Sequence, residues 1–73
     1  MKAKYVMCMD NAGVQVSLTR RRVYKNIASE QEAQGGWVRV VDDTEEDYLF
    51  PATRFVPVQI PEEAEQEFDL ETA

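Results

Sequence analysis

The sequence predicts an all-β domain, a small five-stranded barrel with a short helical turn before the last strand and an acidic C-terminal tail. Apolar and polar residues alternate in short runs, as they do in strands that have one face in a core. Many of the apolar residues, 44% of the chain, are valines and aromatics, which favour strands. With 73 residues, the chain is long enough for one domain only. We therefore expect a barrel over residues 1–60, followed by a tail over residues 61–73.

Two strands and a long loop are expected in the first part of the chain. Residues 5–9 form a nearly continuous apolar run, short enough for a central strand that is covered on both faces. Residues 10–13 predict a turn, because Asn and Gly accept positive φ. The alternating run 14–19 is interpreted as one arm of a long first loop, which returns near Arg20, Arg21 and Arg22. Residues 23–28 then predict the second main strand.

A polar loop is expected between the second and third strands. Residues 29–36 end in Gly-Gly and contain few apolar side chains. Ser29 followed by Glu32 has the spacing of a helix capping box. A single helical turn is therefore expected inside this loop.

A hairpin is expected to follow, beginning at Trp37. Val38 and Val40 alternate with more exposed positions, which predicts a strand with one face in the core. Five carboxylates lie in residues 42–47, and because they repel one another and are costly to bury, the chain is expected to turn there in water. The second strand of the hairpin should stop at Pro51, which has no N–H to donate.

The final strand is expected at residues 55–60, after a helical turn at residues 52–54. Val56, Val58 and Ile60 share one face of this strand. Pro57 is compatible with a strand only where its missing N–H points away from a neighbour. An edge or barrel-closing strand is therefore predicted.

Charge is distributed unevenly along the chain. Residues 1–60 carry eight acidic and eight basic side chains, so the whole net charge of −6 lies in residues 61–73. A neutral body does not suit a binder of phosphate backbones, since counterion release requires a basic surface. Composition therefore argues against nucleic acid as a partner. Arg20, Arg21 and Arg22 nevertheless form a local basic cluster that could attract an acidic partner.

The tail is acidic and contains no base. Pro61 followed by acids is a typical helix start. Like charges make an isolated helix of this length marginal in water. We expect a disordered or marginally helical tail unless Phe68 and Leu70 dock on the body. Its candidate electrostatic residues are Glu62, Glu63, Glu65 and Glu67.

The sequence offers no catalytic, metal-binding or cofactor-binding residues, so we do not expect an enzyme. There is one cysteine and no histidine, which excludes an ordinary zinc site and a Ser-His or Cys-His nucleophile. Cys8 is expected to be a small buried hydrophobe. The acids at 42–47 lack the spacing of a calcium loop. No apolar run is long enough for a signal peptide or a membrane span, so we expect a cytoplasmic protein that does not bind membranes.

From about Tyr5 to Ile60 the chain resembles the Src-homology-3-like barrel. The resemblance rests on the segments Leu18-Thr19, Gly36-Trp37 and Leu49-Phe50-Pro51 with Phe55-Val56 after them. It implies that Trp37 and Pro51 match the tryptophan and proline of a peptide groove. The sequence departs from that pattern at residues 9–11, which lack the family's aromatics, and at residues 20–22, which are basic where the family has acids. These departures argue against ordinary proline-rich ligands.

A second likeness is to small uncharacterised bacterial and phage proteins. It rests on a Cys-x-Asp-Asn segment at residues 8–11, on Leu18-Thr19, and on an Asp-Tyr-Leu-aromatic-Pro segment at residues 47–51 that continues to a Phe. The likeness implies the same barrel and no particular activity.

Two functions are carried forward. The first is a non-enzymatic protein–protein interaction module, monomeric or weakly dimeric, that docks another protein through Trp37, Tyr48, Pro51 and Phe55. Trp37 could equally be a partly buried cap on the core. The alternative function is an inhibitor, encoded by a phage or mobile element, whose acidic surface and tail block a nucleic-acid-binding host protein. Direct binding of nucleic acid through the arginine cluster is the weakest reading.

Overall fold

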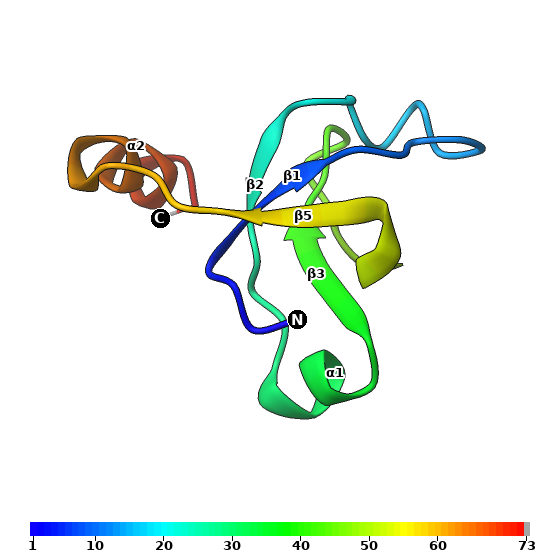
Figure 1. Cartoon of the computed structure of the whole chain (residues 1–73). Coiled ribbons are helices and arrows are strands. Elements are labelled where there is room, and N and C mark those ends of the chain that lie inside the picture. Colours follow the sequence, from blue (N-terminus) through cyan, green and yellow to red (C-terminus); the bar gives the residue numbers. More distant parts are fainter. Residues whose placement is uncertain (73) are drawn as a thin grey trace.

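The computed structural model describes residues 1–72, with side chains as far as Phe68. Within these residues, five strands form two antiparallel sheets (Figure 1). The first sheet has the order β2-β1-β5, with β1 at Tyr5–Cys8, β2 at Val23–Lys25 and β5 at Phe55–Val58. The second sheet pairs β3 at Trp37–Val41 with β4 at Asp47–Pro51. The fold is therefore mostly β, as predicted, with the expected central position for β1.

Three helical segments connect or follow the strands. Helix α1, Glu30–Gln34, lies between β2 and β3, the 3-10 turn η1, Ala52–Arg54, joins β4 to β5, and helix α2, Glu62–Thr72, follows β5. The predicted capping box is present, because the Glu32 amide donates to Ser29 Oγ at 3.1 Å and the Ser29 amide donates to Glu32 Oε1 at 2.9 Å. The helical turns predicted at residues 29–36 and 52–54 are thus confirmed.

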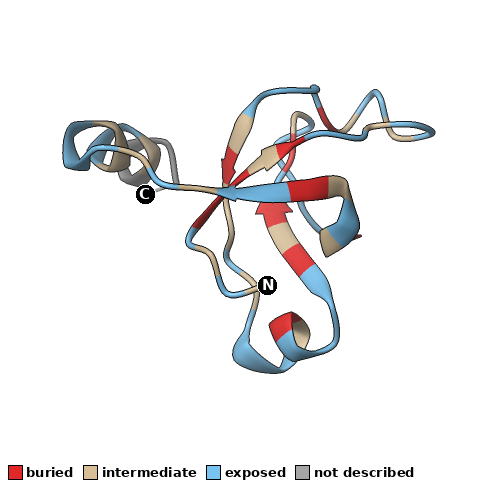
Figure 2. Ribbon diagram, in the orientation of Figure 1, coloured by how far each residue is buried: buried red, intermediate tan, exposed pale blue. Residues whose placement is uncertain are grey.

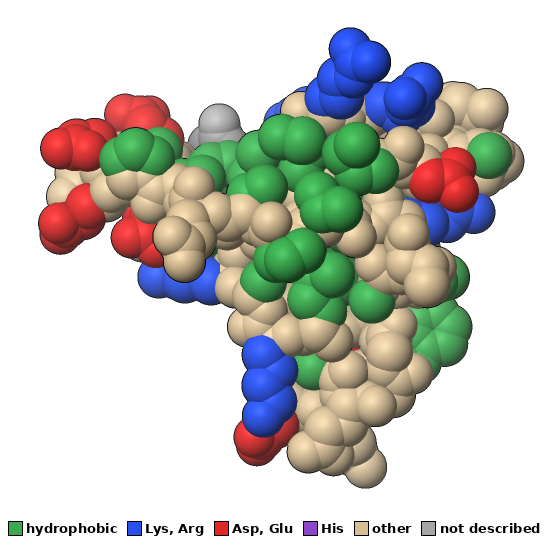
Figure 3. All heavy atoms as spheres, in the orientation of Figure 1, with side chains coloured by type: hydrophobic (Ala, Val, Ile, Leu, Met, Phe, Trp, Pro, Cys, Tyr) green, Lys and Arg blue, Asp and Glu red, His purple; other side chains and the backbone are tan. Residues whose placement is uncertain are grey.

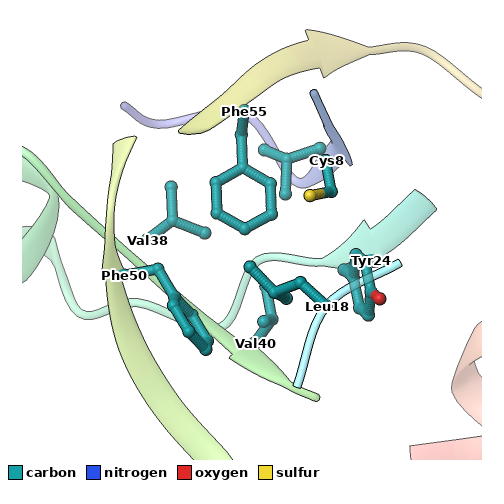
Figure 4. Packing of buried hydrophobic residues seen from close by; sticks show 8 residues of the cluster. Cys8, Leu18, Tyr24, Val38, Val40, Phe50 and Phe55 are labelled. Atoms are coloured by element: carbon teal, nitrogen blue, oxygen red, sulfur yellow. The ribbon is translucent and has the colours of Figure 1, made fainter. Parts of the chain in front are cut away.

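The core lies between the two sheets (Figure 4). Both sheets contribute to it, and the long loop between β1 and β2 adds one large side chain; its buried residues are Val6, Cys8, Leu18, Tyr24, Val38, Val40, Phe50 and Phe55. In β3 the buried positions alternate with more accessible ones, as Figure 2 shows. The predicted alternation of Val38 and Val40 with Trp37 and Val41 is therefore confirmed, as is the burial of Cys8.

The second strand is shorter than the predicted 23–28. After Lys25, the side chain of Asn26 makes hydrogen bonds to both sheets. Its Nδ2 donates to the Ala3 carbonyl at 3.0 Å, and its Oδ1 accepts from the Arg39 amide at 3.3 Å. The Ile27 amide then donates to the Arg39 carbonyl at 2.7 Å. The chain thus leaves β1 at Asn26 and crosses towards β3, because one Asn side chain bridges the two sheets.

Val56 and Val58 share one face of the last strand, as expected, and this is the outer face of the sheet. Cys8 lies opposite Phe55 and Met7 lies opposite Val56, so Phe55 shares the core face with Cys8 while Val56 points outward. The strand ends at Val58 rather than Ile60. Its facing is set by pairing with β1, a contact between distant parts of the sequence. β5 is an edge strand of its sheet, one of the two alternatives expected.

Asp42 also departs from the expectation that every acid of the hairpin turn lies in water. It is buried, and its Oδ1 accepts hydrogen bonds from the Thr44 amide at 2.8 Å and the Thr44 hydroxyl at 2.5 Å. Burial acts to raise the pKa of Asp42, but hydrogen bonds from Thr44, Ser17 and the Glu46 backbone together outweigh it, so that the pKa lies below the ordinary value. The buried carboxylate of Asp42 therefore stabilises the hairpin turn through its hydrogen bonds to Thr44.

Candidate functional site

The outward face of the β3–β4 hairpin carries an apolar strip. The strand register places Trp37 opposite Pro51, and Arg39 opposite Leu49. These positions alternate with the buried Val38, Val40 and Phe50, so their side chains lie on the solvent side of the hairpin. Trp37 is 41% exposed, and Leu49, Val41 and Pro51 are also exposed. We call Trp37, Val41, Leu49 and Pro51 the hairpin strip.

The end of α1 positions the indole of Trp37. A Cβ atom on Gly35 would lie 3.2 Å from Trp37 Cδ1, so the ring packs directly on the glycine backbone. Gly36 has φ +87°, a conformation that favours glycine, and its carbonyl accepts from the Ala52 amide at 2.9 Å. Gly35 therefore supports one side of the indole, while 41% of Trp37 remains exposed.

Arg39 lies in the middle of the strip and is fully engaged. Its Nη2 donates to Glu32 Oε2 at 2.6 Å, its Nε lies 3.2 Å from both Glu32 oxygens, and its Nη1 donates to Asp47 Oδ2 at 2.8 Å. The bonds to Glu32 and then Asp47 raise the pKa of Arg39, while Arg39 lowers the pKa of Glu32 to about 2. The guanidinium thus fastens α1 to the hairpin and presents little free charge.

The turn end of the strip is acidic. Glu45, Glu46 and Asp47 are exposed there. Tyr48 donates its hydroxyl to Glu46 Oε2 at 2.7 Å, and this bond to a carboxylate raises the pKa of Tyr48. A partner of the hairpin strip would therefore meet apolar side chains bordered by negative charge.

The structure brings together two of the four residues predicted to bind a partner. Trp37 and Pro51 are cross-strand neighbours on the hairpin strip. Tyr48 is exposed but lies opposite Val40, so it belongs to the other side of β4, where it lines a hollow with Ser17 and Thr44. Phe55 is only 4% exposed and packs in the core, which excludes it from the surface that the sequence assigned to it.

Sequence reasoning did not single out Leu49 and Val41 as surface contacts. The signal was available, because each lies next in sequence to a buried strand residue, Phe50 or Val40. Their exposure follows from that alternation. What the sequence could not provide was the register that places Leu49 opposite Arg39.

The arginine cluster is divided by the fold. Arg22 Nη1 lies 3.2 Å from Asp43 Oδ1, and its guanidinium lies over the Tyr24 ring at 5.5 Å from the centroid. Arg20 and Arg21 are exposed, and neither has an ion-pair partner among the described side chains. Two of the three arginines therefore remain accessible to an acidic partner.

The acidic tail residues are also divided. Glu65 Oε1 lies 3.3 Å from Lys4 Nζ, and the Phe68 ring packs on the Tyr5 ring with centroids 5.2 Å apart. Glu62, Glu63 and Glu67 are exposed on the remaining surface of α2. The Phe68 contact is the docking on which order in the tail was expected to depend, whereas the side chain of Leu70 lies outside the described residues.

The cysteine and the carboxylates of the described residues do not form a reactive or metal-binding site. Burial raises the pKa of the Cys8 thiol, which disfavours the nucleophilic thiolate. In the part of the chain that the structure describes, no three His, Cys, Asp or Glu side chains are grouped to bind a metal ion. None of the helices in residues 1–72 combines the length and the apolar character that crossing a bilayer requires.

Comparison with known proteins adds no relative. No family model matches the chain, and neither the curated proteins nor the solved structures yield a match.

Proposed function

We propose that the protein is a non-enzymatic protein–protein interaction module on an Src-homology-3-like barrel, which docks its partner on the hairpin strip. The order of elements supports this barrel, since a long loop separates β1 from β2 and a 3-10 turn joins β4 to β5. Phe55 is replaced in the proposed site by Leu49 and Val41, and Tyr48 lies outside it. The single observation that carries the proposal is the exposed indole of Trp37, supported on Gly35 beside Pro51.

An exposed Trp on a rigid support suits a binding hot spot. Its ring is already ordered, so that little conformational entropy is lost when a partner covers it. Arg39 is neutralised by Glu32 and Asp47, and the hairpin turn adds exposed carboxylates at one end. The partner is therefore a protein surface with an apolar anchor and basic side chains next to it.

The first prediction concerns Trp37→Ala. The wild type and the variant are used as baits in a lysate, retained proteins are identified by mass spectrometry, and the affinity of the purified partner is then measured. We expect the variant to bind about tenfold or more weakly, the loss typical of a removed hot spot. Its fold should persist, because Trp37 is not part of the buried core.

The matched control is Ile27→Ala, which removes an exposed apolar side chain from outside the strip. It should leave partner capture unchanged. Full capture by the Trp37 variant would show that Trp37 is not a docking residue, and a thermal transition lost along with binding would show that it acts as a core cap.

A second candidate function is favoured by the placement of α2. Because Glu65 and Phe68 face the body, Glu62, Glu63 and Glu67 are left as a row of exposed carboxylates that could stand in for phosphates. The alternative is therefore an inhibitor that occupies the nucleic-acid site of a host protein. A full-length bait with these three residues changed to Gln separates the functions: selective loss of a nucleic-acid-binding protein supports the inhibitor, and unchanged capture excludes it.

A further inference from the structure

The outer face of the β2-β1-β5 sheet carries a second apolar surface, separate from the hairpin strip. The pairing registers arrange its side chains in rows across the three strands. One row contains Lys25, Tyr5 and Val58, and the next contains Val23, Met7 and Val56. These residues alternate with Val6, Cys8 and Phe55, which face the core. Two successive rows of one sheet face can therefore be compared directly.

Helix α2 covers the first row. Tyr5 is only 3% exposed although it points away from the core, because the Phe68 ring packs on it. Glu65 pairs at the same time with Lys4, at 3.3 Å. This sheet face therefore already binds a helix within the chain. The helix packs an aromatic side chain on the sheet, and a carboxylate one turn away on the same helix pairs with a neighbouring lysine.

Among the side chains that the structure describes, none from α2 covers the second row in this way. Val23 and Met7 are half-buried, Val56 is 41% exposed, and Met9 beyond them is also exposed. In Figure 3, hydrophobic side chains gather over β1, β2 and β5, between the acidic side chains of α2 and a group of basic side chains. A contiguous apolar surface of this kind, bordered by charge, is typical of a docking site. We call Met7, Met9, Val23 and Val56 the sheet strip.

Positive charge borders the sheet strip at the end away from α2. The Arg21 amide donates to the Cys8 carbonyl at 2.6 Å, which places the arginine segment beside the end of β1. Arg22 is paired with Asp43, whereas Arg20 and Arg21 remain accessible. The sheet strip therefore repeats the setting of the covered row, with apolar side chains next to two arginines that form no ion pair with any described side chain.

We propose that the sheet strip binds an acidic amphipathic helix of a partner protein, whose apolar side packs on Met7, Val23 and Val56 and whose carboxylates reach Arg20 and Arg21. Addition of a partner strand to β5 is the main structural alternative. Pro57 lies within this short edge strand and has no N–H to donate, which makes β5 a poor template for a further strand. A helix requires no such donors, and α2 already docks on the neighbouring row.

The probe is a synthetic helical peptide of about 16 residues with Leu and Phe along one face and Glu elsewhere, a length at which a helix can form. A peptide with Lys in place of every Glu is its control. Each is titrated into the full-length ¹⁵N-labelled protein, and amide shifts are followed. We expect the acidic peptide to shift the signals of Met7, Val23 and Val56, and the basic peptide to bind about tenfold more weakly.

Two pairs of variants test the contacts separately. Arg20→Glu should weaken the acidic peptide about fivefold, because it reverses an accessible charge at the border of the strip. Lys2→Glu, which changes the net charge equally at the exposed Lys2–Glu30 pair, should have no such effect. Val56→Thr should weaken binding, whereas Val41→Thr, at the same 41% exposure but on the hairpin strip, should not.

Several results would overturn this proposal. Absence of binding, or equal binding of the acidic and basic peptides, would contradict it. So would amide shifts confined to residues 37–49, or release of α2 with shifts centred on Tyr5. Amide shifts that appear without peptide when the protein is concentrated would show instead that a second copy of the protein occupies the sheet strip. Since Trp37→Ala leaves the sheet strip intact, its effect on partner capture is independent of all these outcomes.

Discussion

At the scale of single residues, Glu32 determines how α1 is attached. The same carboxylate accepts the Ser29 amide, which completes the capping box, and both the Nε and Nη2 of Arg39. The bonds from Arg39 and then from the Ser29 amide stabilise the ionised form and lower the pKa of Glu32 to about 2, from an ordinary value of 4.5. Because Gly35 lies at the end of the same helix, the carboxylate also contributes to the placement of Trp37.

The pH dependence of stability follows from this shift. A carboxylate whose pKa is lower in the folded state than in the unfolded state stabilises the fold fully above pH 4.5, and the contribution is lost as pH falls towards about 2. Glu32→Gln should lower the thermal midpoint at pH 7 and reduce its fall across that acid range. Thermal unfolding followed by circular dichroism at neutral and acid pH measures both effects.

Glu30→Gln is the matched control for Glu32→Gln. Glu30 belongs to the same helix but is exposed, and its only described ion pair is the one with Lys2, at 3.6 Å. Its removal should leave the acid dependence close to that of the wild type. If the two variants behave alike, the Glu32–Arg39 contact does not attach α1.

At the scale of elements, the alternation of apolar and polar residues predicts which side of a strand faces the core. It fails where both sides of the strand are apolar, because pairing with a neighbouring strand then determines the orientation. Val38 and Val40 were identified as core residues from alternation alone, and the capping box of α1 from the spacing of Ser29 and Glu32. The core-facing side of β5 could not be identified in this way, because the residues on both faces of Phe55–Val58 are apolar. Only the pairing with β1 selects Phe55 for the core.

The same limit applies to the candidate site. Trp37 and Pro51 could be associated from the sequence through its resemblance to a barrel with a peptide groove. Their direct opposition required the β3–β4 register. The sheet strip combines β1, β2 and β5, which are far apart in sequence, so no local pattern indicates it.

Helix α2 gives a prediction at this scale. Its hydrophobic contact with the body in the described residues is chiefly Phe68 on Tyr5. Phe68→Ala should lower the free energy of unfolding by about 1–2 kcal/mol, less than for a fully buried Phe, because Phe68 is only half-buried. Urea denaturation measures the loss, and the helical signal in circular dichroism should fall with it.

Glu67→Ala provides the comparison for Phe68→Ala, because Glu67 is the exposed neighbour on the same helix. Alanine favours a helix as well as glutamate does, so little change is expected. A Phe68 variant as stable and as helical as the Glu67 variant would mean that α2 does not depend on Tyr5.

At the scale of the whole molecule, a polar network connects the two sheets across the long loop. Tyr24 in β2 donates its hydroxyl to Asp43 Oδ1 at 2.8 Å and accepts the Thr19 amide at 2.9 Å. Thr19 Oγ1 donates to Asp43 Oδ2 at 2.7 Å. The loop, β2 and the turn of the β3–β4 hairpin are therefore joined at one place.

Tyr24→Phe should weaken this junction while preserving the packing of the ring. The Thr19 amide loses its acceptor and Asp43 loses a donor, so we expect a loss of about 1–3 kcal/mol in the free energy of unfolding. Denaturation should be followed by Trp37 emission, which reports on the second sheet, and by circular dichroism, which reports on the whole chain. The two transitions should shift together.

Tyr48→Phe removes a hydroxyl of the other kind. Its bond to Glu46 is exposed, so its loss should be close to neutral. Equal effects of the two Tyr→Phe changes would indicate that the junction between the sheets depends on apolar packing alone.

The burial of Cys8 makes its thiol a native probe of how often the folded protein opens. The chain contains one cysteine, and its thiol lies in the core between the two sheets, with no access for a reagent in the folded state. Alkylation can therefore proceed only when the sheets separate, so its rate counts the openings of the native protein without any added label. A partner bound on either strip would slow that rate only if its binding also keeps the sheets together.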